Sequence, residues 1–353
     1  MKYRSAFYIL VTLVLASCGG GGGGGEPSTP SIPSASITMS ISSPEIYLAD
    51  EVTITWSTTN ATSCTASGDW SGAKSLSGTE TLSFTTSGQK NFTLTCQNSA
   101  GNETSRSVTT NVIGNVDGVV VGINNISNAN VALDLNNNYQ IDEGEPTSTS
   151  DINGIFELPD DPQDLVSFSG SDDLSGTLFS NISLSSKPSS NSPKVISSLT
   201  SIDYANSGSN DLNTLLSIDQ EIDIYSVNPI ANLNTSSELD KYYEVNAQLF
   251  ILAYSMQAFV NETNSLSLDS SSFFEYLYVL IQQYYDTGQP NLSEYIETSE
   301  FINAYVDTAL IENSIESENI SAFKEMLLAM IKKISVRNNS TATSAIGLSL
   351  IHI

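Results

Sequence analysis

The hydrophobic residues of this 353-residue chain change their period along its length, and this change limits which folds the chain can adopt. Between residues 36 and 113, apolar and polar residues alternate in short segments separated by turn residues. From Ser236 onward, apolar residues recur instead at steps of three and four. A period of two is typical of strands with one buried face, and a period near 3.6 of amphipathic helices. The sequence therefore predicts a multidomain protein with β-structure first and α-structure after it.

The first region, residues 36–113, has the strand pattern of a β-sandwich. Its alternating segments are Ile37–Ile41, Val52–Trp56, Thr81–Phe84, Phe92–Cys96 and Val108–Val112. Short strands at this spacing indicate two packed antiparallel sheets. The run V-T-I-T-W-S-T-T-N-A-T-S-C-T-A-S-G, followed by F-T-L-T-C, resembles bacterial Ig-like domains. The resemblance implies an Ig-like β-sandwich, although Cys64 follows Trp56 in this chain, whereas in antibody domains the cysteine comes first.

Cysteine and tryptophan residues in this region predict a stabilised core. Cys64 and Cys96 are the cysteines left when Cys18 is set aside, and in an exported chain such a pair predicts a disulfide. Two free buried thiols are the alternative. Trp56 and Trp70 are expected in the core, with a platform that stacks on sugar rings as the alternative.

Residues 1–17 have the composition of an export signal. Lys2 and Arg4 precede a short apolar segment, Ala6–Ala16, which is too short to span a bilayer. The segment L-A-S-C that ends at Cys18 resembles the lipobox of bacterial lipoproteins. The resemblance implies cleavage before Cys18 and its lipidation, and Gly19 after it implies sorting to the outer membrane. An ordinary signal peptide is the alternative. Residues 18–35 are rich in Gly, Ser and Pro and are expected to form a flexible tether.

A second module is expected over residues 114–159, around the stretch D-L-N-N-N-Y-Q-I-D-E-G-E. Its positions 1, 3, 5, 9 and 12 carry side-chain oxygens and position 7 offers a backbone carbonyl; these are Asp134, Asn136, Asn138, Asp142, Glu145 and Gln140. Calcium takes six to eight oxygen ligands, so this spacing predicts a calcium loop. An Asx-rich turn that binds nothing is the alternative.

The residues around this loop favour strands over the helices of an EF-hand. Val131–Leu133 is strand-like, and Pro146 prevents a helix from following. Tyr139 stands where an EF-hand has glycine. With the later segment T-S-D-I-N-G-I-F, the stretch resembles the calcium-binding B-type repeats of bacterial surface adhesins and the carboxypeptidase-regulatory-like modules. The resemblance implies a small calcium-binding β-module.

The rest of the chain is expected to be a Ser- and Asn-rich connecting region, residues 160–235, and an α-helical domain, residues 236–347. The predicted helices carry apolar stripes at Leu239–Val260, Phe273–Tyr284, Phe301–Ala309 and Phe323–Ile334. Together they predict an antiparallel bundle. Its many tyrosines are expected in the core, with a binding surface as the alternative.

The last six residues, L-S-L-I-H-I at 348–353, match what a transposon-end sequencing adaptor would encode. We expect them to be read-through, and the native chain to continue past about Gly347. The single histidine, His352, lies there, so no histidine chemistry is predicted.

A net charge of −27 argues against nucleic-acid binding and favours cation binding. The leading hypothesis is a surface-anchored outer-membrane lipoprotein that binds an unknown protein or glycan ligand, in adhesion, with calcium as its cofactor. The alternatives are a fragment of a secreted polysaccharide-active enzyme and a structural or assembly protein of the cell envelope. An enzyme is not expected, since acids on amphipathic helices are usually a solvated face. Candidate carboxylates for it are Glu294, Glu297, Glu300, Glu312 and Glu325.

Overall fold

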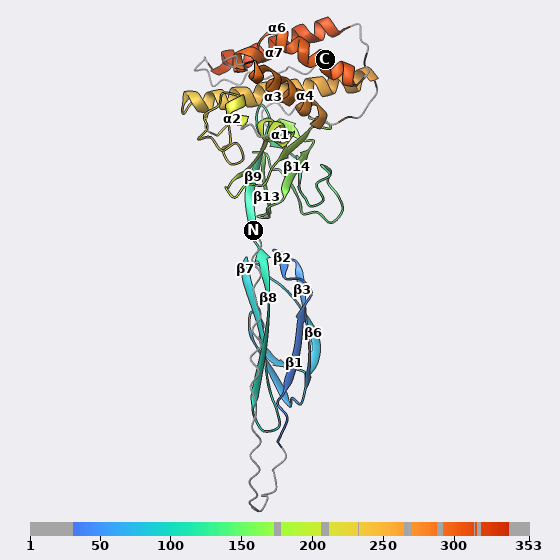
Figure 1. Cartoon of the computed structure of the whole chain (residues 1–353), viewed down its shortest axis with the longest axis vertical. Coiled ribbons are helices and arrows are strands. Elements are labelled where there is room, and N and C mark those ends of the chain that lie inside the picture. The colour runs from blue at the N-terminus through green and yellow to red at the C-terminus, as the bar shows by residue number, and fades with distance from the viewer. Residues whose placement is uncertain are drawn as a thin grey trace, which may run out of the picture. The chain divides into compact units, whose positions relative to one another are not determined.

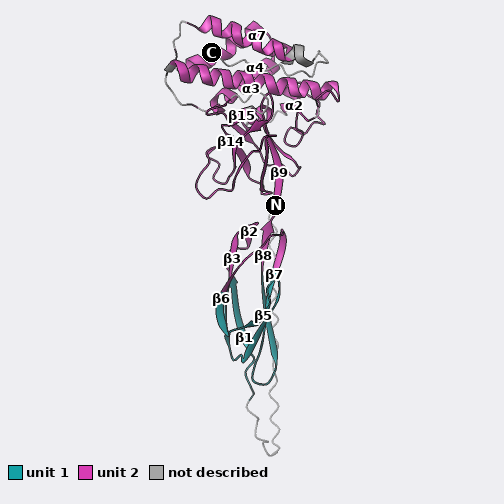
Figure 2. Ribbon diagram, turned by 180° about the vertical axis from the view of Figure 1, so that it is seen from behind, with its two compact units in different colours: residues 1–40, 54–79, 91–108 teal, residues 41–53, 80–90, 109–353 magenta. Residues whose placement is uncertain are grey.

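The structure is a computed structural model that describes residues 31–172, 178–205, 212–231, 233–264, 268, 270–287, 292–313, 315 and 319–338. The predicted signal segment, Cys18, most of the tether and residues 348–353 lie outside the described residues. Contacts divide the chain into two compact units (Figure 2). The first unit comprises residues 1–40, 54–79 and 91–108, and the second comprises residues 41–53, 80–90 and 109–353.

Residues 36–113 form a β-sandwich of eight strands (Figure 1). They are β1 (Ser36–Ile41), β2 (Glu45–Tyr47), β3 (Glu51–Thr59), β4 (Ser63–Gly68), β5 (Gly72–Lys74), β6 (Ser77–Ser83), β7 (Gly88–Gln97) and β8 (Glu103–Ile113). One sheet has the order β1-β3-β6, and the other has the order β2-β8-β7-β4-β5, in which β2 runs parallel to β8. Immunoglobulin-like domains distribute their strands in this way, with the first, third and sixth strands in one sheet and the others in the second sheet. The predicted Ig-like sandwich is confirmed.

The core of the sandwich contains both tryptophans. Trp56 and Trp70 are only 5% and 4% exposed, and their rings meet edge to face at 5.4 Å. Each indole N–H donates to a backbone carbonyl, Trp56 to Ser75 at 2.9 Å and Trp70 to Thr93 at 3.1 Å. Burial on this scale rules out the alternative of an exposed sugar-stacking platform.

The predicted disulfide is confirmed between Cys64 on β4 and Cys96 on β7. The two residues are direct partners in the antiparallel register, with their Cα atoms 4.1 Å apart. The bridge therefore joins neighbouring strands of one sheet, whereas antibody domains join two sheets.

The described residues between 115 and 197 contribute nine further strands. They are β9 (Asn115–Val121), β10 (Ile126–Ser127), β11 (Asn130–Asp134), β12 (Thr147–Thr149), β13 (Ile155–Pro159), β14 (Asp164–Phe168), β15 (Ser171–Asp172), β16 (Ser183–Ser186) and β17 (Lys194–Ser197). They form sheets of order β13-β9-β17, β12-β11-β14-β16 and β10-β15. Strands on both sides of residue 160 share all three sheets. The boundary predicted at 159/160 is therefore wrong, because the presumed connecting region supplies strands that the β-module needs as partners.

Seven helices lie in the described part of the C-terminal region. They are α1 (Ser198–Ala205), α2 (Leu212–Leu215), α3 (Ser237–Asn264), α4 (Ser271–Asp286), α5 (Leu292–Ile296), α6 (Ser299–Glu312) and α7 (Ile320–Asn338). The four predicted helices are α3, α4, α6 and α7, which pack on one another. Helix α1 contacts β16 and β17 on one side and α3 and α4 on the other (Figure 1). No described helix is long and apolar enough to cross a membrane.

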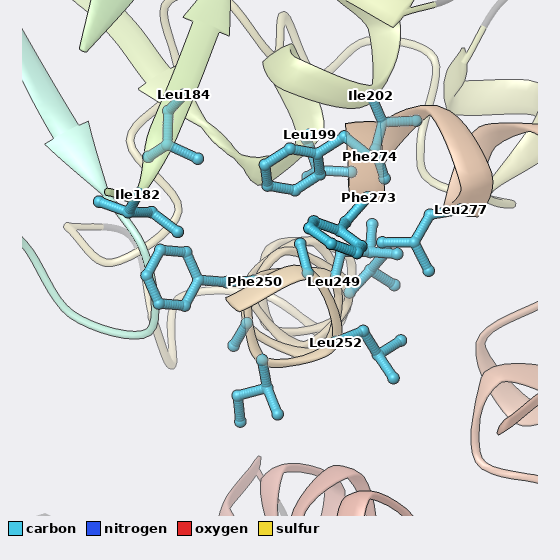
Figure 3. Close-up of a cluster of buried hydrophobic side chains, with 14 of the residues drawn as sticks. Ile182, Leu184, Leu199, Ile202, Leu249, Phe250, Leu252, Phe273, Phe274 and Leu277 are labelled. Carbon is cyan, nitrogen blue, oxygen red and sulfur yellow. The ribbon is translucent and has the colours of Figure 1, made fainter. Parts of the chain in front are cut away.

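Strands and helices of residues 114–338 share one hydrophobic core. Phe250 of α3 and Phe273 of α4 pack in the same cluster as Leu184 of β16 and Leu199 of α1 (Figure 3). The cluster also includes Val131 of β11. The prediction of a separate β-module and a separate helical bundle is therefore corrected to one α+β arrangement, since the apolar faces of sheets and helices cover each other. Tyr242 and Tyr243 are fully buried there, as expected for core tyrosines.

Candidate calcium loop

The stretch Asp134–Glu145 connects two antiparallel strands. Strand β11 ends at Asp134, and β12 begins at Thr147, directly after Pro146. The N–H of Leu133 donates to the Pro146 carbonyl at 3.1 Å, which closes the base of the loop. The prediction of a loop between strands, instead of between helices, agrees with this arrangement, while calcium itself stays a prediction.

Asp134, at the first position, is fully buried. Its Oδ1 accepts the N–H of Asn138 at 3.1 Å, and its Oδ2 accepts the N–H of Tyr139 at 2.8 Å. The loop therefore winds around this carboxylate. A buried carboxylate is unfavourable unless its charge is matched by hydrogen bonds or by a cation.

The side-chain oxygens of Asn136 and Asn138 also accept backbone N–H groups of the loop, each from the residue two positions further along. Asn136 Oδ1 accepts the N–H of Asn138 at 3.1 Å, and Asn138 Oδ1 accepts the N–H of Gln140 at 2.8 Å. Both side-chain amides donate to Asp142 Oδ2, at 2.8 and 2.6 Å. These local bonds bring positions 3, 5 and 9 together, as Asx turns commonly do.

Glu145, at the twelfth position, joins the two ends of the loop. Its Oε1 accepts the N–H of Leu135 at 2.9 Å, and its Oε2 accepts the N–H of Asp142 at 3.0 Å. The carboxylate that the spacing assigns to the last ligand position is thus held within the loop by backbone donors from both halves.

These residues have the donor chemistry that a hard cation prefers. All five predicted side chains bear oxygens and are bound to one another or to the loop backbone, and a carboxylate has about four acceptor sites, more than these hydrogen bonds occupy. Gln140 donates its N–H to Asn138, and its carbonyl is the group that the spacing assigns. In the described part of the chain, no three His, Cys, Asp or Glu side chains gather as a metal cluster. The loop combines carboxylates with carboxamides, a mixture typical of calcium ligands.

The later D-I-N-G segment forms the turn before β13. Asp151 Oδ1 accepts the N–H groups of Asn153 and Ile155, at 2.8 and 2.9 Å. Gly154 has φ +74°, and a Cβ there would lie 2.8 Å from the Val120 carbonyl oxygen. A glycine is required at this position for both reasons.

Two residues that the sequence analysis did not identify lie against the loop. The Tyr139 ring meets the Tyr204 ring of α1 edge to face at 5.1 Å, and Tyr204 Oη donates to Asp164 Oδ2 at 2.5 Å. Burial and then the bond to Asp164 raise the pKa of Tyr204 above its ordinary value of 10.0. Both residues lie far from the loop in sequence, so no local pattern could have found them.

A hollow of about 520 Å³ lies beside α3 and α7. Its lining includes Tyr254, Gln257, Phe259, Phe323 and Met330. The rings of Phe259 and Phe323 stack at 4.1 Å. Apolar walls with a few polar groups are typical of small-molecule sites.

Comparisons with known proteins place this chain in no family. No family model matches it, and no curated protein matches it. Two structures of BcpA, the major pilin subunit of Bacillus cereus, align at 14% and 13% identity. They cover 46% and 45% of this chain and 69% and 67% of the pilin, with TM-scores of 0.22 and 0.21. Fibronectin(III)-like modules of CbhA from Clostridium thermocellum align at 10% identity over 42% of this chain and 86% of theirs, with a TM-score of 0.18. At such scores these likenesses carry no argument, and the Ig-like assignment rests on strand order.

Proposed function

We propose that this chain is a lipid-anchored outer-membrane protein that binds an external partner in adhesion, and that calcium at Asp134–Glu145 stabilises its α+β part. The observation that carries the proposal is the buried Asp134 carboxylate, which accepts N–H groups of the loop backbone, in a loop where Asn136 and Asn138 are bound to Asp142. A bound calcium ion would supply positive charge that backbone N–H groups replace only in part.

The proposed role of calcium is structural. The loop begins at the end of β11, and β11 is hydrogen-bonded to both β12 and β14. Holding the loop closed therefore holds the end of a central strand. Because the ion would bind the folded chain and not the unfolded one, it would stabilise the fold by mass action.

A binding role for the remainder is supported by surface chemistry. The net charge of −27 disfavours acidic partners and nucleic acid, which leaves neutral or basic protein or glycan ligands. The hollow beside α3 and α7 offers apolar walls and polar groups for such a ligand. Among the acids considered for an enzyme, Glu297 accepts a hydrogen bond from Gln248 at 3.1 Å, a contact suited to packing. We therefore rank catalysis below binding. An assembly role in the envelope ranks with binding.

Thermal melting of the full chain in EDTA and in CaCl2 tests the calcium part. We expect calcium to raise the melting temperature, with a stabilisation of about 2.7 kcal/mol when calcium is at 100 times its dissociation constant. Glu145→Gln should abolish the calcium-dependent rise. Glu143→Gln is the matched control, since Glu143 lies exposed in the same loop at a position without a predicted ligand. Equal melting temperatures in EDTA and calcium would exclude the proposed site.

A further inference from the structure

The loop is held against the rest of the fold by residues outside the calcium motif. Asp164 is the first residue of β14, and Asp134 and Asp164 are direct partners in the antiparallel register. Tyr204 lies near the end of α1 and donates its phenol hydrogen to Asp164 Oδ2 at 2.5 Å. The same Tyr204 ring packs on Tyr139 of the loop at 5.1 Å. One side chain thus contacts both the loop and the strand beside its first ligand.

The conformation of Tyr139 indicates that this contact matters. Its φ is +63°, in the left-handed region that a side chain of this size rarely adopts. A glycine would take this conformation without strain, and glycine is the residue that calcium loops usually have at the sixth position. The ring contact with Tyr204 is what tyrosine provides there and glycine cannot.

The pairing of Asp134 with Asp164 gives the phenol a second role. Like charges directly opposite each other on neighbouring strands repel, and Asp134 is fully buried. The hydrogen bond from Tyr204 holds one oxygen of the Asp164 carboxylate. The Asp134 carboxylate accepts its hydrogen bonds from the loop backbone instead.

We propose that Tyr139, Tyr204 and Asp164 are positioning residues of the calcium loop, which hold it in its binding conformation and link its occupancy to helix α1. This inference rests on the proposed function, namely that the loop binds calcium. Groups that orient metal ligands without touching the metal commonly change metal affinity when they are removed. Because coupling is reciprocal, calcium stabilises the Tyr139–Tyr204 contact by as much as the contact strengthens calcium binding.

Tyr139→Gly tests whether calcium affinity depends on the Tyr139–Tyr204 ring contact or only on the backbone conformation at residue 139, because the two explanations predict opposite changes in affinity. If only the backbone conformation of the loop matters, glycine relieves strain and calcium binds more tightly. If the ring contact matters more, calcium binds about tenfold more weakly, in the range typical of ligand-positioning residues. Calorimetric titration of the full chain with CaCl2 measures the dissociation constant directly. Unchanged or tighter binding by this variant overturns the proposal.

Tyr204→Phe provides a second variant that keeps the aromatic ring and removes the hydroxyl that donates to Asp164. We expect weaker calcium binding by this variant as well, by a smaller factor than in Tyr139→Gly. Tyr285→Phe is the matched control, because Tyr285 is 39% exposed on α4. Tyr204→Phe that binds calcium as tightly as this control overturns the role given to the Tyr204–Asp164 bond.

Hydrogen exchange of α1 provides a readout apart from affinity. Added calcium should slow exchange of the α1 amides in the unaltered chain, and this slowing should be lost in Tyr139→Gly. Calcium-dependent protection of α1 that persists in Tyr139→Gly overturns the link to the helix. An unaltered chain that binds no calcium overturns the proposed function together with this inference, whereas normal binding with unaffected variants overturns this inference alone.

Discussion

At the scale of single residues, the fold depends on a few close approaches that the sequence marks only as glycines. Gly118 lies on β9 directly opposite Phe156 of β13. A Cβ at Gly118 would lie 2.1 Å from the Phe156 ring, and Phe156 is 2% exposed. The ring therefore occupies the space that any other residue at 118 would need. Glycine in this strand is a packing requirement, although its effect on strand propensity is unfavourable.

We therefore expect Gly118→Ala to destabilise the α+β part by about 1–3 kcal/mol, the usual range for overpacking a core. Urea unfolding followed by circular dichroism measures the change. Asp117→Ala, at the exposed neighbouring position, is the control and should have little effect. Adding Phe156→Leu to Gly118→Ala should recover part of the loss, because the two residues contact each other. Full stability in Gly118→Ala alone would contradict this account.

At the scale of secondary-structure elements, prediction succeeded where a pattern is local. The alternating segments of residues 36–113 and the four long helices appear near their predicted positions, because their periodicity and turn residues lie within the element. The candidate calcium loop has the predicted strand before it for the same reason, and Pro146 ends it before β12.

Prediction failed where an element depends on distant partners. Strands β14 and β16 lie in a Ser- and Asn-rich segment without clear alternation, and they are strands because β11 and the helices bury them. Helix α1 is short, and its buried Ser198, Thr200 and Ser201 give no apolar stripe. Ser201 Oγ instead donates to the Ser197 carbonyl at 2.7 Å. Tyr204 and Asp164, beside the loop, could not be assigned for this reason.

The shared core makes a clear prediction about residues 114–159. Their apolar residues pack in one cluster with the helices, and Asn246 of α3 donates to the Gly122 carbonyl at 2.9 Å. A segment this short buries too little apolar surface to fold without such partners. We expect isolated residues 114–159 to be unfolded even in calcium, and residues 114–338 to fold. Dispersed amide signals in the NMR spectrum of the short segment would show that the module is independent after all.

At the scale of the whole molecule, the largest buried side chains include the tyrosines Tyr242, Tyr243 and Tyr305. Tyr242 is fully buried and donates to the Val227 carbonyl at 3.0 Å. Burial raises the pKa of Tyr242, and burial with a carboxylate partner raises the pKa values of Tyr204 and Tyr225. Each phenol stays neutral in the folded chain at a pH where it ionises in the unfolded chain.

Stability should therefore fall with rising pH. With folded-state pKa values above the ordinary value of 10.0, this contribution is fully present below pH 10 and is lost progressively as the pH rises from 10 toward the folded-state pKa. Melting temperatures measured from about pH 8 to 11 should decline mainly at the alkaline end. Tyrosinate absorbance should appear together with unfolding. Titration of all tyrosines near their ordinary pKa with the fold intact would contradict this prediction.

The parallel pairing of β2 with β8 has a mechanical consequence. Three residue pairs join these strands, from Glu45–Asn111 to Tyr47–Ile113, and they lie near opposite ends of the sandwich sequence. A chain held at its N-terminal side and pulled through a partner bound beyond residue 113 would draw β2 and β8 in opposite directions. Because the strands are parallel, such a pull slides one along the other and loads their hydrogen bonds together, whereas an antiparallel pair would open one bond at a time. The sandwich is thus connected to resist a pull applied between the chain on its N-terminal side and the chain on its C-terminal side.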